Sequence, residues 1–594
     1  MRPSLPRVTV LLFALLSDGA ASSSQAPAPR WPSGGTLVAT GSIRTAGLDG
    51  AWRSTVDLVD GRFDTRSDLG VYRIGDIYDG RTRWRLEPSG GHHPLDSDFA
   101  QATARTEAWL ARFGWLQAGH AGAAFSAPVG KSADGRIYLI RTATPSGGRP
   151  VLLWFDAATG DLMKSERRGW MGPIVTRYGD YRTAYGQRLP FRMSDDDQTI
   201  KVTHYTIARG RSDARFAPPP QPDDTTLAAG GTTVPAPIFP QLVVEASING
   251  SAPMGFVFDT GGHSVLTPAA ADALGLTAVG GSQTGGTGTG TITQRDTRVK
   301  TLRIGDAVLH DQHFFVLSLG YPNMEQGAKP PLAGLLGLEI AERFIVRMNY
   351  RAGTLTLLPR DTPLACRGNW QTVRFTDDMP TVTGSLDGTP AAFTIDTGST
   401  GALQVYDHWA RRHNVAERYR HGVETLSYGA GGASRNWVSH GGEVRLGDAT
   451  IRKPLVRITD DKNGIAQSIT EAGNLGTGIL AHYTLTFDYA RSQVCFDYVP
   501  GYVTEPFNRS GMRAIKIDPD VFAVSLVNPG SPAALAGLRK DDLIVSVEGR
   551  SARLLSGGDL SRILTRTPGT RVKLDYLRDG NIHHAEIALR EMLP

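Results

Sequence analysis

The sequence predicts a mainly β protein of several domains, with two copies of one β-rich lobe in its central part. The apolar runs are short, alternate with polar residues and end at turn signals, which is typical of strands. Glycine is frequent, at 69 of 594 residues. A chain of this length also exceeds what a single hydrophobic core supports, so several domains are expected.

Residues 1–21 have the pattern of a secretory signal peptide. Arg2 and Arg7 precede an apolar run from Val8 to Leu16, and small residues follow as far as Ala21. The run is too short to cross a bilayer, which takes about 20 residues. We therefore expect a periplasmic or secreted protein without an integral membrane segment after signal cleavage. The formal charge of +5 is scattered along the chain, which argues against a nucleic-acid partner.

Residues 28–208 predict a β-rich N-terminal domain. Alternating segments such as "TLVATGSIRT" and "RIYLIRTAT" surround one helical pattern, "DFAQATARTEAWLARFGW". They indicate a curved antiparallel sheet against a helix. The stretch that begins "LLWFDAATGDLMKSERR" resembles periplasmic lipoprotein-carrier domains, which implies a half-barrel sheet and leaves a carrier of lipid or lipoprotein as one alternative. Residues 209–236 are rich in Pro, Gly, Asp and Thr, and we expect a linker there.

An internal repeat occupies residues 237–500. "FVFDTGG" returns as "FTIDTGS", and the two aspartates, Asp259 and Asp396, are 137 residues apart (396 − 259). "RIGDAVL" and "LLGLEIAERFIVRMNY" likewise return in the same order as "RLGDATI" and "NLGTGILAHYTLTFDY". This predicts two lobes, 237–361 and 362–500, packed about a pseudo-twofold axis.

The repeated aspartates predict a chemistry. A carboxylate at the end of an apolar strand is costly to bury alone. If the lobes meet at their axis, Asp259 and Asp396 face each other and share one proton. One carboxylate then acts as general base toward a water, and its protonated partner polarises the scissile carbonyl. Such a reaction needs no metal or other cofactor and forms no covalent acyl intermediate.

The residues beside the aspartates are expected to support them. Gly261 and Gly398 permit tight turns and close backbone approach. Thr260 and Thr397 can hydrogen-bond across the interface and fix the two turns relative to each other. Ser399 can donate its hydroxyl to the neighbouring carboxylate.

With these motifs, residues 237–500 resemble the pepsin-like and retropepsin-like aspartic proteases, with both lobes in one chain. The resemblance implies a bilobal β-barrel fold and an endopeptidase that cuts extended polypeptides. It also implies that each Asp-Thr-Gly loop passes beneath an apolar-apolar-Gly segment, which residues 335–337 and 474–476 match. Flap hairpins are expected at 280–294 and 427–437, with Tyr428 as a candidate flap tyrosine.

Two departures from the family pattern make the surroundings of the aspartates unequal. Gly262 stands where the family has Ser, Thr or Ala, so Asp259 loses a hydroxyl partner. Asn474 replaces an apolar residue in the second loop. An inactive periplasmic peptide-binding or scaffold protein, with the same cleft, is therefore the alternative function.

Residues 506–594 contain "NPGSPAALAGLRKDDLIVSVEG", which resembles PDZ domains of periplasmic proteases. The resemblance implies a groove between the strand at "SGMRAI" and the helix that contains Leu560, where an extended peptide adds as a further strand. A packing module is the alternative. The residues expected to bind peptide ends are Gly511, Met512, Arg513, Ala514 and Ile515.

The two cysteines, Cys366 and Cys495, flank the second lobe, and an oxidising compartment favours a disulfide over two buried thiols. The paired histidines, such as His92 and His93, have no carboxylate or cysteine at recognisable ligand spacing. We expect them on solvated turns and strand faces, with no metal bound.

Overall fold

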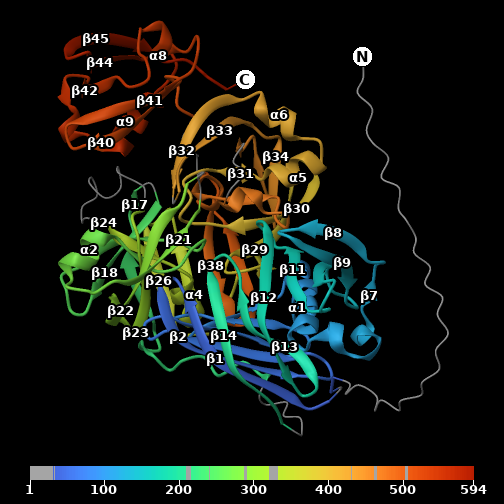
Figure 1. Ribbon diagram of the computed structural model, residues 1–594. Helices are drawn as coiled ribbons and strands as arrows, with labels where there is room; N and C mark the ends of the chain where they lie inside the picture. Colours follow the sequence, from blue (N-terminus) through green and yellow to red (C-terminus); the bar gives the residue numbers. More distant parts are fainter. Residues whose placement is uncertain are drawn as a thin grey trace, which may run out of the picture.

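The structure is a computed structural model that describes residues 31–32, 34–208, 216–239, 241–286, 290–319, 332–429, 431–459, 464–501 and 506–593. The chain is mainly β, as predicted (Figure 1). The signal pattern at 1–21 lies outside the described residues. Within the described ranges, no helix combines the length and apolar character needed to cross a membrane.

The N-terminal domain is one 14-stranded antiparallel sheet that packs against helix α1 (Figure 1). Its first strand pairs with its last, β1 with β14, and the remaining strands follow in order on either side. The Ser97 side chain caps α1, and Ala104, Ala108 and Trp109 bury one face of the helix. The elements are β1 (Thr36–Thr45), β2 (Leu48–Asp57), β3 (Phe63–Asp68), β4 (Arg73–Tyr78), β5 (Arg83–Leu86), β6 (His92–Leu95), α1 (Asp98–Ala111), β7 (Ala124–Phe125), β8 (Val129–Ala133), β9 (Arg136–Thr144), β10 (Val151–Asp156), β11 (Leu162–Arg168), β12 (Pro173–Ala184), β13 (Gln187–Ser194) and β14 (Gln198–Ala208).

The described part of the expected linker lies against the rest of the molecule. Phe216 is buried, and β15 (Thr225–Thr226) pairs with a strand of the first lobe. Strand β16 (Thr232–Pro235) is the edge of a sheet that both lobes share. Its Pro and Gly residues prevent this segment from forming a core of its own. It pairs instead with strands of the first lobe, so that lobe effectively begins before residue 237.

The first lobe is built on a nine-stranded sheet and the second on a ten-stranded sheet. In both, the strand that ends in Asp-Thr-Gly lies parallel to a later strand, with Phe258 opposite Leu336 in one and Ile395 opposite Leu475 in the other. The duplication in the sequence is therefore a duplication of the fold. The first lobe has β17 (Ile238–Phe239), β18 (Gln241–Ile248), β19 (Met254–Phe258), β20 (Val265–Leu266), α2 (Pro268–Ala273), β21 (Val279–Thr284), β22 (Ile292–Ile304), β23 (Ala307–Val316), β24 (Leu332–Leu336) and α4 (Leu338–Arg343). The second has β28 (Arg374–Phe375), β29 (Pro380–Leu386), β30 (Thr389–Ile395), β31 (Leu403–Val405), α5 (Asp407–Arg412), α6 (Ala416–Arg420), β32 (Val423–Gly429), β33 (Gly432–His440), β34 (Glu443–Leu446), β35 (Ala449–Arg452), β36 (Leu455–Thr459), β37 (Gly473–Leu475) and α7 (Thr477–Leu480).

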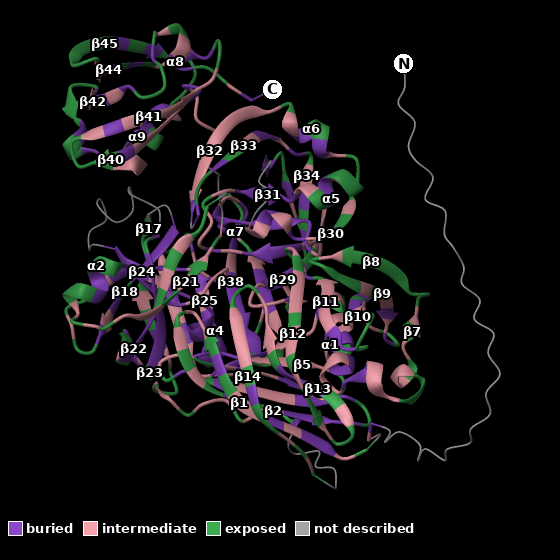
Figure 2. Cartoon of the chain, in the orientation of Figure 1, coloured by how far each residue is buried: buried purple, intermediate pink, exposed green. Residues whose placement is uncertain are grey.

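A six-stranded sheet joins the two lobes. It consists of β16, β25 (Ile345–Asn349), β26 (Thr354–Leu358), β27 (Asn369–Thr372), β38 (Tyr483–Asp488) and β39 (Gln493–Tyr498), with β25 of the first lobe paired to β38 of the second. Cys366 and Cys495 form a disulfide, with their Cα atoms 5.8 Å apart. One hydrophobic core runs through both lobes, and strands such as β30 contribute buried residues to it, whereas β21 and most of β32 are intermediate or exposed (Figure 2).

The C-terminal domain has a hydrophobic core of its own around Phe522 and Ile544. Strand β40 is an edge of its sheet and lies on the side nearest the lobes (Figure 1). Ser556 and Asp559 form a capping box that starts helix α9, whose Leu560 packs into the domain core. The elements are β40 (Met512–Asp518), β41 (Val521–Val527), α8 (Pro532–Leu535), β42 (Leu543–Val547), β43 (Arg550–Ser551), α9 (Gly557–Leu564), β44 (Arg571–Arg578) and β45 (Asn581–Ala588).

Candidate active site

The two aspartates of the repeat meet at the interface between the lobes. Asp259 follows β19 and Asp396 follows β30, and each carboxyl group lies against the glycine of the opposite turn, Asp259 against Gly398 and Asp396 against Gly261. Both line a cavity of about 1460 Å³. The geometry on which the sequence interpretation depends, two acids side by side in one cleft, is therefore present.

The threonines beside the aspartates lock the two turns together. The backbone amide of Thr260 donates to Oγ1 of Thr397 at 3.0 Å, and the amide of Thr397 donates to Oγ1 of Thr260 at 3.2 Å. Each hydroxyl in turn donates to a carbonyl of the opposite strand, Thr260 to Ile395 and Thr397 to Phe258. Because both threonines are buried, these four bonds are shielded from water and hold the aspartates in register.

The glycines of the two turns are needed for close approach between the lobes. A Cβ atom on Gly398 would lie 2.4 Å from Cγ of Asp259, and one on Gly261 would lie 2.7 Å from Cγ of Asp396. Each glycine thus makes room for the aspartate of the other lobe. Neither has a positive φ, so the requirement is space and not backbone conformation.

The hydrogen bonds around the two carboxylates are unequal. Asp259 accepts from the amide of Gly261 at 2.9 Å. Asp396 accepts from the amide of Ser399 at 2.9 Å and also from Nδ2 of Asn474 at 2.6 Å. The bond recorded from Ser399 is thus made by its amide, whereas the sequence suggested its hydroxyl.

This inequality decides where the shared proton resides. Burial raises the pKa of Asp259 to about 8, and the charge of Asp396 adds to the rise. Burial also raises the pKa of Asp396, but the hydrogen bond from Asn474 opposes that rise. The donor from Asn474 therefore favours the charge of the pair on Asp396 and the proton on Asp259.

Two hairpins close the cavity, one from each lobe. Thr284 at the end of β21 and Tyr428 near the end of β32 both line it. The amide of Gly290 in the first hairpin donates to the carbonyl of Gly431 in the second at 2.8 Å. The hairpins expected from the glycine-rich segments therefore meet each other across the cleft.

Each hairpin also contacts a domain outside the lobes. The amide of Gly281 on β21 donates to the carbonyl of Ala46 in the N-terminal domain at 2.6 Å. On the other side, Nδ2 of Asn528 in the C-terminal domain donates to the carbonyl of Glu424 on β32 at 2.9 Å. The position of each hairpin is thus tied to one of the flanking domains.

The residues predicted to bind peptide in the C-terminal domain open into the same cavity. Gly511, Met512, Arg513, Ala514 and Ile515 line it, together with Ser561 of α9. The groove between β40 and α9 and the pair of aspartates therefore belong to one continuous space.

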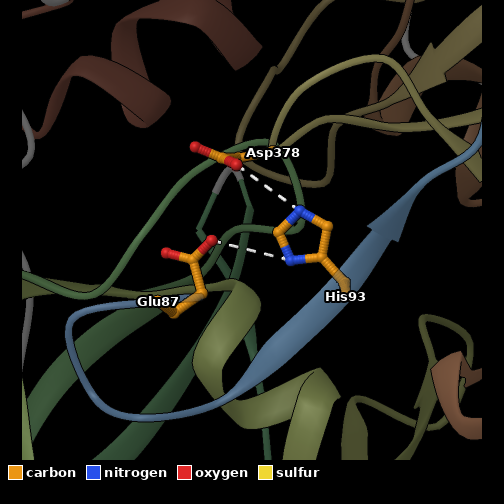
Figure 3. A group of neighbouring side chains, drawn as sticks. All are labelled: Glu87, His93 and Asp378. Atoms are coloured by element: carbon orange, nitrogen blue, oxygen red, sulfur yellow. Dashed lines mark ion pairs between the residues drawn. The ribbon is translucent and has the colours of Figure 1, made fainter. Parts of the chain in front are cut away.

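A buried ionic network lies beside the cleft, where the N-terminal domain meets both lobes (Figure 3). Ligand atoms of Glu87, His93 and Asp378 lie within 4.8 Å of one another, the spacing of a possible metal site. However, Nδ1 of His93 faces Glu87 at 3.6 Å, whereas Nε2 faces Asp378 at 3.4 Å. A single ion binds only one nitrogen of a ring, so this arrangement fits an imidazolium between carboxylates better than a ligand set.

The network corrects one expectation. His93 was expected on a solvated face, but it is buried, and its Nδ1 lies 2.9 Å from Oε1 of Glu342. His263, four residues after Asp259, likewise bridges Glu339 at 2.9 Å and Asp378 at 3.2 Å. Sequence analysis missed these partners because they come from three separate parts of the chain.

Comparison with known proteins agrees with the fold and the motifs. Residues 244–340 match the family model described as aspartyl protease, and residues 524–578 match the model described as PDZ domain. Two segments of the chain are therefore similar to known domains, one to an aspartyl protease and one to a PDZ domain.

One curated relative matches a short part of the chain. The periplasmic pH-dependent serine endoprotease DegQ of Escherichia coli (strain K12) is 46% identical over 67 residues, which are 11% of this chain and 14% of that protein. The match therefore spans only a small part of the length of that protease.

Solved structures resemble separate parts of the chain. A putative outer membrane lipoprotein-sorting protein domain from Vibrio parahaemolyticus (11% identity, TM-score 0.23) covers 31% of this chain and 89% of its own. A LolA superfamily protein from Nitrosomonas europaea (15%, TM-score 0.24) covers 32% and 92%. A retropepsin-like aspartic protease from Rickettsia conorii (19%, TM-score 0.17) covers 22% and 92%. At these TM-scores no functional conclusion follows from them.

Proposed function

We propose that the protein is an exported aspartic endopeptidase that hydrolyses peptide bonds in extended polypeptides through Asp259, Asp396 and a water. The observation that carries the proposal is the pair of aspartates at the interface between the lobes, in unequal surroundings, lining a cavity that two hairpins also line. The match to the aspartyl protease family supports it.

The unequal aspartates have distinct roles in this reaction. The ionised Asp396 takes a proton from the water, and the protonated Asp259 donates a hydrogen bond to the carbonyl oxygen of the scissile peptide. The water oxygen attacks the carbonyl carbon, and a proton then passes to the leaving nitrogen as the C–N bond breaks. Asn474 favours this assignment because it donates to the charged form of Asp396.

Export is part of the proposal. The signal pattern at residues 1–21 supports it, and so does the disulfide between Cys366 and Cys495, since disulfides persist in oxidising compartments. The PDZ domain would recognise part of the polypeptide or regulate the cleft, because its groove opens into the same cavity.

The test compares the purified mature protein with its Asp259→Asn and Asp396→Asn variants on an unfolded polypeptide, across acidic and neutral pH. We expect each substitution to lower kcat by about 10²- to 10⁴-fold, since each removes one member of the acid–base pair. Asp377→Asn is the matched control, because Asp377 lines the same cavity but lies outside the pair. Cleavage that persists in both variants would contradict the proposal, and binding without cleavage by the unmodified protein would favour the scaffold alternative.

A further inference from the structure

Arg513 lines the cavity that joins the PDZ domain to the cleft and has no counterion among the residues that the structure describes. It lies on β40, and its guanidinium carbon is 5.9 Å from the ring centroid of Tyr428 on the second hairpin. Its Nε atom is buried and makes no hydrogen bond within the described part of the chain. No ion pair of Arg513 occurs with any described carboxylate, and burial lowers its pKa.

Neighbouring cations of the same region are already neutralised. Arg435 donates to both oxygens of Glu424 at 2.7 and 2.8 Å, so the acid of β32 nearest the PDZ contact is occupied. Arg562, which also lines the cavity, donates to Asp559 at 2.7 Å. Desolvating a guanidinium is costly unless an anion joins it, and no carboxylate among the described residues pairs with the half-buried Arg513.

Part of the loop before β40 is already hydrogen-bonded within the loop. The amide of Met512 donates to Oγ of Ser510 at 3.1 Å, and the amide of Ser510 donates to Oδ1 of Asn508 at 2.8 Å. These two amides are therefore not free to hold a carboxylate, whereas the side chain of Arg513 lines the cavity at this end of the groove.

We propose that Arg513 binds a carboxylate of the polypeptide substrate, so that the protein selects chains that carry an acidic group where they pass from the PDZ groove toward the dyad. The planar guanidinium suits a bidentate pair with a carboxylate, and the Tyr428 ring below it fixes its plane. The carboxylate is either an Asp or Glu side chain or the free carboxyl terminus. This inference rests on the proposed function, because it assumes that the bound polypeptide is a substrate. It concerns binding, however, and is tested without cleavage.

The experiment measures binding of one fluorescent extended peptide to the full-length protein carrying Asp259→Asn, which removes turnover. The peptide is made in four forms, with acidic or amide side chains and with a free or an amidated carboxyl terminus. We expect Arg513→Gln to weaken binding of the forms that carry the recognised carboxylate about tenfold. Binding of the fully neutral form should stay unchanged. The form that loses affinity identifies whether a side chain or the terminus is bound.

Two matched variants keep the result interpretable. Arg513→Lys retains the charge and should restore part of the affinity. Arg435→Gln removes an ion-paired arginine of the neighbouring hairpin that does not line the cavity, and it should leave the affinity unchanged. Equal melting temperatures would establish that Arg513→Gln is folded. Unchanged affinity of Arg513→Gln for all four peptides would overturn the inference, whereas absence of cleavage by the unmodified protein would overturn only the proposed function.

Discussion

At the scale of single residues, one amide makes the two halves of the dyad different. Asn474 and Leu335 occupy equivalent positions beneath the two Asp-Thr-Gly turns, but only Asn474 donates to a carboxylate. The departure from the family pattern was visible in the sequence, yet its consequence was not, because donation depends on where the side chain points.

Replacing the side-chain amide of Asn474 is expected to shift the pH dependence of kcat/KM. The hydrogen bond from Asn474 favours the charged form of Asp396. Asn474→Leu removes this bond, so the pKa of Asp396 should rise. Since Asp396 must be ionised to act as base, the acid limb of kcat/KM should move to higher pH. Steady-state assays from pH 3 to 9 would show it. An unmoved acid limb, with normal melting behaviour, would remove Asn474 from the mechanism.

At the scale of elements, the turns after β19 and β30 work as an interlocked pair. Gly398 packs against Asp259, so a methyl group there has to displace the carboxylate of the other lobe. By contrast, a Cβ atom on Gly262 would lie 3.3 Å from a carboxylate oxygen, a contact that a small shift relieves.

These contacts predict opposite outcomes for two glycine substitutions. Gly398→Ala should lower kcat by at least about 10²-fold, because misplacing a catalytic group by about 1 Å has an effect of this size. Gly262→Ala, at the position that corresponds to Ser399 in the other turn, should retain most of the activity. Peptide-cleavage kinetics and a crystal structure of Gly398→Ala would check this. Equal loss in both variants would indicate a general effect on folding.

At the scale of the whole molecule, the N-terminal domain is joined to both lobes by the buried network around His93. Burial alone would lower the pKa of His93, but hydrogen bonds to Asp378 and Glu342 raise it to about 10. Burial raises the pKa of Glu87 to about 8. Burial alone would raise the pKa of Glu339 as well, but the charge of His263 and its hydrogen bonds lower it to about 2.

The network should therefore stabilise the protein most in mildly acidic solution. The raised pKa of His93 contributes stability that is complete below its ordinary value of 6.5 and is lost as pH rises toward 10. The raised pKa of Glu87 likewise contributes stability that is lost as pH rises toward 8. The lowered pKa of Glu339 contributes stability that is complete above 4.5 and is lost as pH falls toward 2.

Removal of His93 tests this dependence. His93→Ala removes the hydrogen-bond partner of the buried Glu342 carboxylate and should destabilise the protein by about 3 kcal/mol near pH 6, as loss of one partner of a buried pair does. Near pH 10 the difference should shrink, because the native imidazole has lost much of its charge. Thermal melts at both pH values, with His204→Gln on an exposed strand as control, measure the effect. A pH-independent difference would contradict the role of charge.

The sequence by itself determined the class of each region. Alternating apolar positions and turn residues are local signals, and the β-rich N-terminal sheet followed from them. The duplicated lobes followed from the internal repeat, and the PDZ domain followed from the resemblance of one segment to known PDZ sequences. The identity of the facing aspartates followed from the repeat, because two copies of one lobe place equivalent turns at their axis. Only the tertiary structure decided which side chains surround those turns. His93 and Glu342 are separated by 249 residues, and Arg513 meets the hairpin of another domain. Such contacts depend on how finished domains pack, and no local periodicity in the chain encodes that packing.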